Sequence, residues 1–223
     1  MKHRTTSTLD RPGGPPPGAP PDRGVRRATP AETNALSRSL ASAFRDDPVF
    51  GWCIPDPRQR DRHLAAWFRV VVDALLVHGE TYCTHDKAGA ALWVPAGVAP
   101  LDEEQGERLG AATADLGDEA AARIQALTGL MEASHPDEPH LYLWFAGVRA
   151  GRQGRGYGGR LLQSRLSRAD EQALPAYLEA TSVRNRALYE RHGFEVTGEL
   201  SVDGSPPLWQ MWRDPRPAPS GRW

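Results

Sequence analysis

The chain has 223 residues, with 27 Lys plus Arg against 28 Asp plus Glu and a formal net charge of -1. This length predicts one domain with a sizeable core, and the balanced charge argues against a general nucleic-acid binder. The sequence lacks the run of about 18 apolar residues that a membrane span needs. The basic start, Met1 to Arg4, leads into Thr and Ser, so we expect no secretory leader. Cys53 and Cys83 are too few for a disulfide framework and are predicted to be buried in a protein of the reducing cytoplasm.

The first 24 residues are predicted to be a disordered tail. Residues 11–22 are almost entirely Pro and Gly and contain little that a core could bury. One folded domain is expected over residues 25–214, followed by a flexible tail over 215–223.

The first half of the domain is predicted to be mainly helical. A capping box at Thr29–Glu32, with proline at the first helical position, starts a helix whose apolar face carries Leu36, Leu40 and Phe44. This helix ends before Pro48, because proline disfavours helical geometry in the preceding residue. The following elements are a helix over 63–77, a strand pair over 81–84 and 90–94, and a helical segment over 102–133 with a break near Gly117.

The second half alternates between strands and helices. A strand, a helix and a second strand joined by short loops imply a right-handed parallel crossover. The fold class is therefore α/β or α+β with one mixed sheet. The predicted elements are strands over 141–148, 176–180, 194–200 and 207–212, and helices over 156–171 and 185–192.

The segment from Val148 to Leu162 joins a strand to a helix and contains four glycines between positions 154 and 159. Glycines allow close backbone approach, and the free N–H groups of a helix start attract phosphate. The spacing also satisfies the G-x-G-x-x-G pattern of dinucleotide-binding folds, with Glu179 near the position of a ribose-binding acid. Only one crossover follows the loop, which argues against that fold, and the absence of a following Lys excludes a P-loop.

Two motifs resemble those of the GNAT N-acetyltransferase family. Gln153, Gly156 and Gly158 match its acetyl-CoA loop, Gln/Arg-x-x-Gly-x-Gly/Ala. The run from Asn185 to Tyr189, followed by Gly-Phe, is similar to its Asn-x-x-x-Tyr helix. Within the family, the stretch over residues 175–194 looks most like the puromycin N-acetyltransferase branch.

This resemblance implies the GNAT fold, a mixed and mostly antiparallel sheet with a central parallel crossover. It also implies acetyl-CoA as co-substrate and direct attack by a primary amine through a tetrahedral intermediate. The implied acetyl-CoA site comprises Gly147, Val148, Gln153, Gly154, Arg155, Gly156, Tyr157, Gly158, Gly159 and Asn185.

The catalytic roles follow from position. Asn185 and Tyr189 project from one helix face; the family match makes Asn185 a ligand of the cofactor arm and Tyr189 the acid that protonates the departing thiolate. Glu179 matches a glutamate of the puromycin branch and is the candidate general base, acting through water. The alternative for Glu179 is a structural salt bridge to Arg184 or Arg186.

Further candidates concern the oxyanion and the acceptor. Gly147 is expected to mark a β-bulge whose N–H stabilises the oxyanion. Asp46 and Asp47 either bind a cationic amine or form a helix-end turn. Most of the tryptophans Trp52, Trp67, Trp93 and Trp144 are expected to fill the core, but one or two, with Trp93 as the chosen candidate, are expected to line a pocket for a flat aromatic acceptor. The stripe of His63, Trp67, Val70 and Val71 is interpreted as packing. No metal is expected, since the histidines lack metal-ligand spacing.

These observations predict an N-acetyltransferase acting on a small-molecule amine, for example an aminonucleoside or another antibiotic-like amine. Three alternatives stay open: a protein or peptide N-acetyltransferase, a nicotinamide enzyme, and a silent CoA-binding module. An open acidic groove would favour the protein or peptide N-acetyltransferase, whereas a closed, tryptophan-lined pocket would favour a small-molecule acceptor. We expect no nucleic-acid or membrane partner and a monomer or homodimer.

Overall fold

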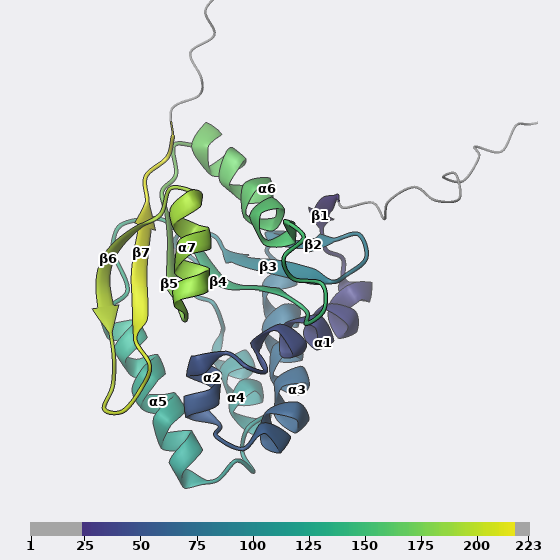
Figure 1. The fold of residues 1–223 in the computed structure, drawn as a ribbon, viewed down its shortest axis with the longest axis vertical. Helices are drawn as coiled ribbons and strands as arrows, with labels where there is room; N and C mark the ends of the chain where they lie inside the picture. Colours follow the sequence, from purple (N-terminus) through teal and green to yellow (C-terminus); the bar gives the residue numbers. More distant parts are fainter. Residues whose placement is uncertain (1–23, 217–223) are drawn as a thin grey trace, which may run out of the picture.

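One mixed sheet of seven strands, in the order β1-β2-β3-β4-β5-β7-β6, forms the centre of the protein (Figure 1). The structure is a computed structural model and describes residues 24–216. The tails predicted over 1–24 and 215–223 therefore lie outside the described residues, apart from residues 24, 215 and 216. The strands are β1 (Val25–Arg27), β2 (Thr81–Thr84), β3 (Gly89–Val94), β4 (Leu141–Val148), β5 (Ala176–Ala180), β6 (Glu195–Leu200) and β7 (Leu208–Arg213).

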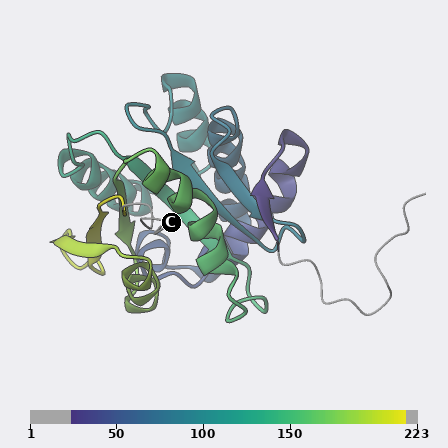
Figure 2. The same ribbon diagram turned by 90° about the horizontal axis from the view of Figure 1, so that it is seen from above.

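Helices cover both faces of this sheet (Figure 2). One core cluster packs α6 and α7 against the strands, a second packs α1 and α3 against the other face, and a third joins α2 and α5 to β6 and β7. Among the described residues, no helix combines the length and apolar character required to cross a bilayer. The helices are η1 (Pro30–Glu32), α1 (Thr33–Phe44), α2 (Pro48–Cys53), α3 (Pro57–Leu76), α4 (Glu103–Ala111), α5 (Asp118–Ala133), α6 (Tyr157–Glu171) and α7 (Val183–Arg191).

Local capping explains where the structure departs from the predicted elements. The helix expected from residue 63 begins at Pro57, because the Asp56 side chain accepts a hydrogen bond from the Arg58 N–H and caps the extra turns. The short helix α2 was not predicted; Asp47 caps it and Pro48 occupies its first position. The expected break near Gly117 is confirmed, since this residue has a φ of 87° immediately before α5.

The parallel pair β4 and β5 separates soon after it begins. The two strands pair only at Leu141 with Ala176 and at Tyr142 with Tyr177, although β4 continues to Val148. Their carboxyl ends therefore diverge and leave space between them. All the other strand pairs are antiparallel, which confirms the predicted mixed sheet with a central parallel crossover.

A β-bulge interrupts β4 at Trp144. Leu92 pairs with Phe145 and Trp93 pairs with Leu143, so Trp144 is the extra residue. Side chains normally alternate between the two faces of a strand, and one extra residue breaks that alternation. Trp144 and Phe145 consequently both pack toward the α1 and α3 face, where they form part of a cavity wall.

Candidate functional site

The glycine loop between β4 and α6 adopts a conformation that few other residues allow. Gly151, Gly154 and Gly156 have φ values of 75°, 74° and 77°, and Gly156 forms the left-handed start of α6. A Cβ atom added at any of the three would meet nothing within 4 Å. The loop backbone is thus accessible from outside the fold.

A cavity of about 700 Å³ extends along this loop. Nine of the ten residues predicted for the acetyl-CoA site line it; Arg155 does not line it and is exposed. Its wall also includes Asp46, Asp47 and one face of α7. The predicted residues that line the cavity are Gly147, Val148, Gln153, Gly154, Gly156, Tyr157, Gly158, Gly159 and Asn185.

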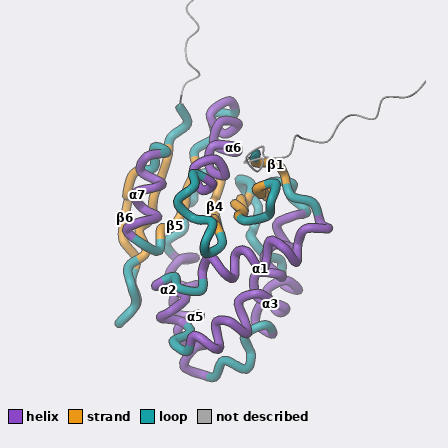
Figure 3. The backbone as a smooth tube through the Cα atoms, turned by 45° about the vertical axis from the view of Figure 1, so that its right-hand side comes forward, coloured by secondary structure: helices purple, strands orange, loops and turns teal. Residues whose placement is uncertain are grey.

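The start of α6 lies close to α7 and to the residue that follows it (Figure 3). A Cβ atom at Gly158 would lie 3.1 Å from Leu188, and one at Gly159 would lie 3.1 Å from His192. Gln153 tightens the loop from within, because its Nε2 donates to the Val148 carbonyl at 3.0 Å. The helix start therefore presents its free N–H groups to the cavity.

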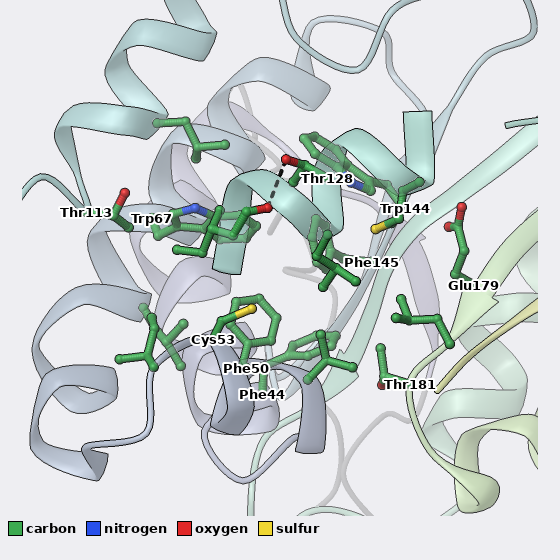
Figure 4. A pocket seen from close by; sticks show the side chains of 18 of the residues that line it. Phe44, Phe50, Cys53, Trp67, Thr113, Thr128, Trp144, Phe145, Glu179 and Thr181 are labelled. Carbon is green, nitrogen blue, oxygen red and sulfur yellow. Dashed lines mark hydrogen bonds between the residues drawn. The ribbon is translucent and has the colours of Figure 1, made fainter. Parts of the chain in front are cut away.

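A second cavity, of about 380 Å³, lies between α2, α3, α4, α5 and β4. Its wall is mostly apolar and largely aromatic (Figure 4). Trp67 packs edge-on against Phe50 and Phe145, with ring centroids 5.5 and 5.4 Å apart, and Phe44 packs similarly on both phenylalanines. These interlocked rings hold the cavity open in a fixed shape.

The two cavities meet where β4 and β5 diverge. Phe44, Ala146, Asn185 and Tyr189 line both of them, and the last two lie on one face of α7, as predicted. Burial and the nearby charge of Asp47 raise the pKa of the Tyr189 hydroxyl. The phenol is therefore protonated at neutral pH and holds its proton more tightly than an ordinary tyrosine does.

Glu179 lies in the wall of the aromatic cavity. Its Oε2 accepts a hydrogen bond from the Tyr142 hydroxyl at 2.8 Å, whereas its buried Oε1 has no partner among the described residues. Burial raises the pKa of this carboxyl to about 7. The alternative of a salt bridge is wrong, because Arg184 contacts Gln153 and Arg186 pairs with Glu190.

A network of polar and aromatic side chains surrounds Tyr177, which lies on β5 two residues before Glu179. The Tyr177 hydroxyl accepts a hydrogen bond at 3.0 Å from Gln210 Nε2, which also donates to the Ser134 carbonyl at 2.8 Å. The rings of His135 and His140 pack against the Tyr177 ring, with centroids 5.1 and 5.3 Å away. This network fixes the two tyrosines beside the carboxylate.

Gly147 does not form the predicted bulge. It pairs regularly with Ala90, and the bulge lies at Trp144 instead. A Cβ atom at Gly147 would lie 2.8 Å from Ala43 and 3.1 Å from Phe44. The glycine therefore permits the close approach of α1 to β4.

The predicted acceptor residues lie away from the aromatic cavity. Asp46 is exposed and pairs with Arg45 at 3.1 Å. Asp47 is buried as the N-cap of α2, accepting hydrogen bonds from two backbone N–H groups and from Thr181, so the helix-end interpretation applies. Trp93 is fully buried in the core on the α6 face of the sheet.

Two residues assigned to packing in the sequence contribute to the aromatic cavity. His63 and Trp67 line it from α3, at the edge of the stripe that was interpreted as core. Trp144 joins them because of the bulge in β4. A helical stripe alone does not distinguish a core from a cavity wall, since both require apolar side chains. Cys53 also lines the cavity and, like Cys83, is buried as predicted.

Known proteins resemble this chain in sequence and in structure. It is 25% identical over 205 residues to an uncharacterised N-acetyltransferase of Schizosaccharomyces pombe, covering 86% of this chain and 83% of the relative. A crystal structure titled as histone acetyltransferase HPA2 and related acetyltransferase from Corynebacterium glutamicum is 29% identical, with a TM-score of 0.64; the match covers 88% of this chain and 98% of that one.

A Drosophila melanogaster polyamine N-acetyltransferase shares the fold at 16% identity, with a TM-score of 0.55 and coverage of 86% of this chain and 99% of that one. The sequence profile described as the acetyltransferase (GNAT) family matches residues 61–194, more than half of the chain. The protein therefore belongs to the GNAT family of acetyltransferases.

Proposed function

We propose that this GNAT acetyltransferase moves the acetyl group of acetyl-CoA to the primary amine of a small molecule. The observation that carries the proposal is the meeting of two cavities at Tyr189. One cavity follows a glycine loop at a helix start, and the other is mostly apolar, has aromatic side chains in its wall and includes the carboxylate of Glu179. This arrangement suits two substrates that react at a shared point.

The residues of the glycine loop fit the donor substrate. Acetyl-CoA carries a pyrophosphate, which free backbone N–H groups at a helix start can bind. Gly154 and Gly156 leave this backbone uncovered, and Asn185 lines the same cavity. These residues would hold acetyl-CoA, whose thioester supplies the activated acetyl group.

The side chains at the junction supply the proton transfers. Glu179 removes a proton from the acceptor ammonium, through a water molecule. The amine nitrogen then bonds to the acetyl carbon and gives a tetrahedral intermediate. This intermediate loses a second proton from nitrogen to solvent and collapses to the amide as the carbon–sulfur bond breaks. Tyr189 donates its proton to the departing thiolate and recovers one from solvent. A base with a pKa of about 7 is half deprotonated at neutral pH, as this role requires.

Two observations favour this function over the alternatives. The acceptor cavity is mostly apolar and is lined by Trp67 and Trp144 rather than by a row of acidic residues, which favours a small molecule over a peptide. Glu179 lies in that cavity rather than beside the loop, so it is poorly placed to bind the ribose of a nicotinamide dinucleotide. Puromycin, an aminonucleoside, is a sensible first acceptor because of the resemblance over residues 175–194.

The test combines binding with turnover. Titration calorimetry should detect acetyl-CoA binding and no binding of NAD or NADP. Tyr189→Phe should lower kcat by about tenfold to a thousandfold and leave acetyl-CoA affinity nearly unchanged, as expected when one general acid is lost. Release of the CoA thiol measures the rate. Unchanged turnover would remove Tyr189 from the mechanism, and nicotinamide binding alone would contradict the proposal.

A matched pair of loop variants tests the donor site. Gly156→Val should abolish acetyl-CoA binding, because a branched residue at a φ of 77° distorts the loop. Gly129→Val, in the exposed part of α5 with nothing within 4 Å of its Cβ, should leave binding intact. Retained binding in the Gly156 variant would mean that the loop does not contact acetyl-CoA.

A further inference from the structure

We propose that the acceptor is a lipophilic amine with a single positive charge: one primary ammonium on an aromatic or branched apolar body. Polyamines and other acceptors with a second cationic group are then poor substrates. The proposal rests on the proposed acetyl transfer and adds the substrate class. It concerns the cavity of about 380 Å³ beside Glu179.

The charges around this cavity allow for one buried cation. Two carboxylates are part of its lining, Glu179 and Glu132. Glu179 is half-buried, and its Oε1 has no hydrogen-bond partner among the described residues. Glu132 is exposed on α5, where water screens its charge. His63 also lines the cavity; its Nδ1 lies 3.2 Å from the Ala112 carbonyl oxygen and 3.4 Å from Asp115, whereas its Nε2 has no partner among the described residues.

The aromatic walls define the body of the acceptor. Figure 4 shows Glu179 at one end of the cavity, with Trp67 and Thr113 at the opposite end and Phe145 between them. An ammonium beside Glu179 therefore places the rest of its molecule among the rings. A flat apolar group gains dispersion and hydrophobic contact there. Apart from Glu179, the lining offers a second cation only the exposed carboxylate of Glu132 as a partner.

The shape of the cavity is preorganised for such a body. The edge-to-face contacts among Phe44, Phe50, Trp67 and Phe145 keep the rings apart at centroid distances of 5.4 to 5.6 Å. The bulge at Trp144 adds a further aromatic side chain to the same wall. A rigid apolar cavity binds a rigid apolar group at little cost in conformational freedom.

A pair of acceptors of nearly equal size tests the charge requirement. 4-Phenylbutylamine and agmatine share a four-carbon primary amine and end in a flat group, neutral in the first and cationic in the second. We expect kcat/KM for 4-phenylbutylamine to exceed that for agmatine by about a hundredfold, in line with the penalty for an unpaired buried charge. Thiol release measures both rates, and calorimetry measures both affinities without turnover.

The outcomes separate this inference from the proposed function. If neither acetyl-CoA nor any amine binds, the acetyl transfer itself is wrong. If acetyl-CoA binds and agmatine is acetylated or bound as well as 4-phenylbutylamine, the proposed function survives and the substrate class is overturned. Binding of neither amine to a protein that binds acetyl-CoA would also overturn the substrate class.

A designed variant makes the test sharper. Thr113→Asp introduces a carboxylate at the end of the cavity opposite Glu179, on the partly exposed segment between α4 and α5. This variant should raise kcat/KM for agmatine, relative to kcat/KM for 4-phenylbutylamine, by at least about tenfold. The reason is that the new carboxylate can pair with the second cation of agmatine. Thr113→Asn, similar in size and uncharged, should leave the ratio unchanged. Equal ratios in both variants would show that the acceptor body does not reach this end.

Discussion

At the scale of single residues, the hydroxyl of Tyr142 controls the proposed base. It donates to one oxygen of Glu179, whereas the other oxygen is buried and has no hydrogen-bond partner among the described residues. Tyr142 lies at the last point where β4 and β5 pair, so the sheet itself positions this contact. The groups that face Glu179 are Tyr142 and Tyr177, with Gln210 and two histidines behind them.

The pH dependence of turnover tests this contact. Glu179 must be ionised to act as a base, so kcat/KM should rise with pH through about 7, the pKa of Glu179. The hydrogen bond from Tyr142 favours the ionised form and lowers the pKa of Glu179. Tyr142→Phe should therefore shift the rising limb to higher pH. Tyr82→Phe, which removes a hydroxyl bonded to Glu80 at 3.2 Å, is the control, and an unmoved limb in the Tyr142 variant would exclude this role.

Sequence patterns predicted the residues of the donor cavity better than those of the acceptor cavity. Glycines such as Gly154 and Gly156 are informative because their residue type itself indicates an unusual backbone geometry, here a positive φ. The acceptor wall is made of ordinary apolar residues such as Trp67, which a core would also contain. Asp46 and Asp47 suggested a cation site, but a helix N-cap prefers the same residue type.

At the scale of elements, the packing of α1 on β4 shapes both cavities, because Phe44 at the end of α1 lines each of them. The predicted stripe of Leu36, Leu40 and Phe44 is buried against this strand, as expected. The bulge that turns Trp144 into the cavity was predicted at the wrong residue. Bulge position depends on pairing with β3, and that register is not encoded in the strand's own pattern.

A glycine substitution tests the contact between α1 and β4. Gly147→Ala should destabilise the protein by about 1 to 3 kcal/mol, the usual range for overpacking, because its Cβ would lie 2.8 Å from Ala43. Gly129→Ala should instead stabilise it by about 0.5 to 1 kcal/mol, since alanine is the better helix former at an open position. Urea denaturation measures both values. Equal stabilities of the two variants would contradict the close packing.

At the scale of the whole molecule, a buried ion pair joins the end of the sheet to α6. Arg213 on β7 contacts Asp170 on α6 at 2.8 Å, and its Nε donates to the His192 carbonyl at 2.9 Å. Asp170 also accepts a hydrogen bond from the Arg216 N–H at 2.8 Å. Sequence analysis did not predict this pair, because its partners are 43 residues apart in the chain.

Removing this carboxylate tests its contribution to stability. Asp170→Asn should lower the free energy of unfolding at pH 7 by about 3 kcal/mol, because it leaves Arg213 buried without a counter-charge. The contacts with Arg213 and the Arg216 N–H lower the pKa of Asp170. Its contribution should therefore be complete above its ordinary pKa of 3.8 and disappear as pH falls below that value.

Denaturation of Asp170→Asn and of the unmodified protein across acidic pH measures the difference between their free energies of unfolding. Asp73→Asn is the control, since the ion pairs of Asp73 within residues 24–216 are long contacts of 4.0 Å with exposed arginines. A stability gap between Asp170→Asn and the unmodified protein that stays constant down to pH 2 would contradict the assignment.

The short seam between β4 and β5 also has a mechanical consequence. Two residue pairs connect the strands on one side of the sheet to β5, β7 and β6 on the other. When a pulling force is applied across the sheet, very few hydrogen bonds between β4 and β5 resist it together. We expect the molecule to rupture first along this line, and to do so at a lower force than along the longer seam between β3 and β4, where six residue pairs share the load.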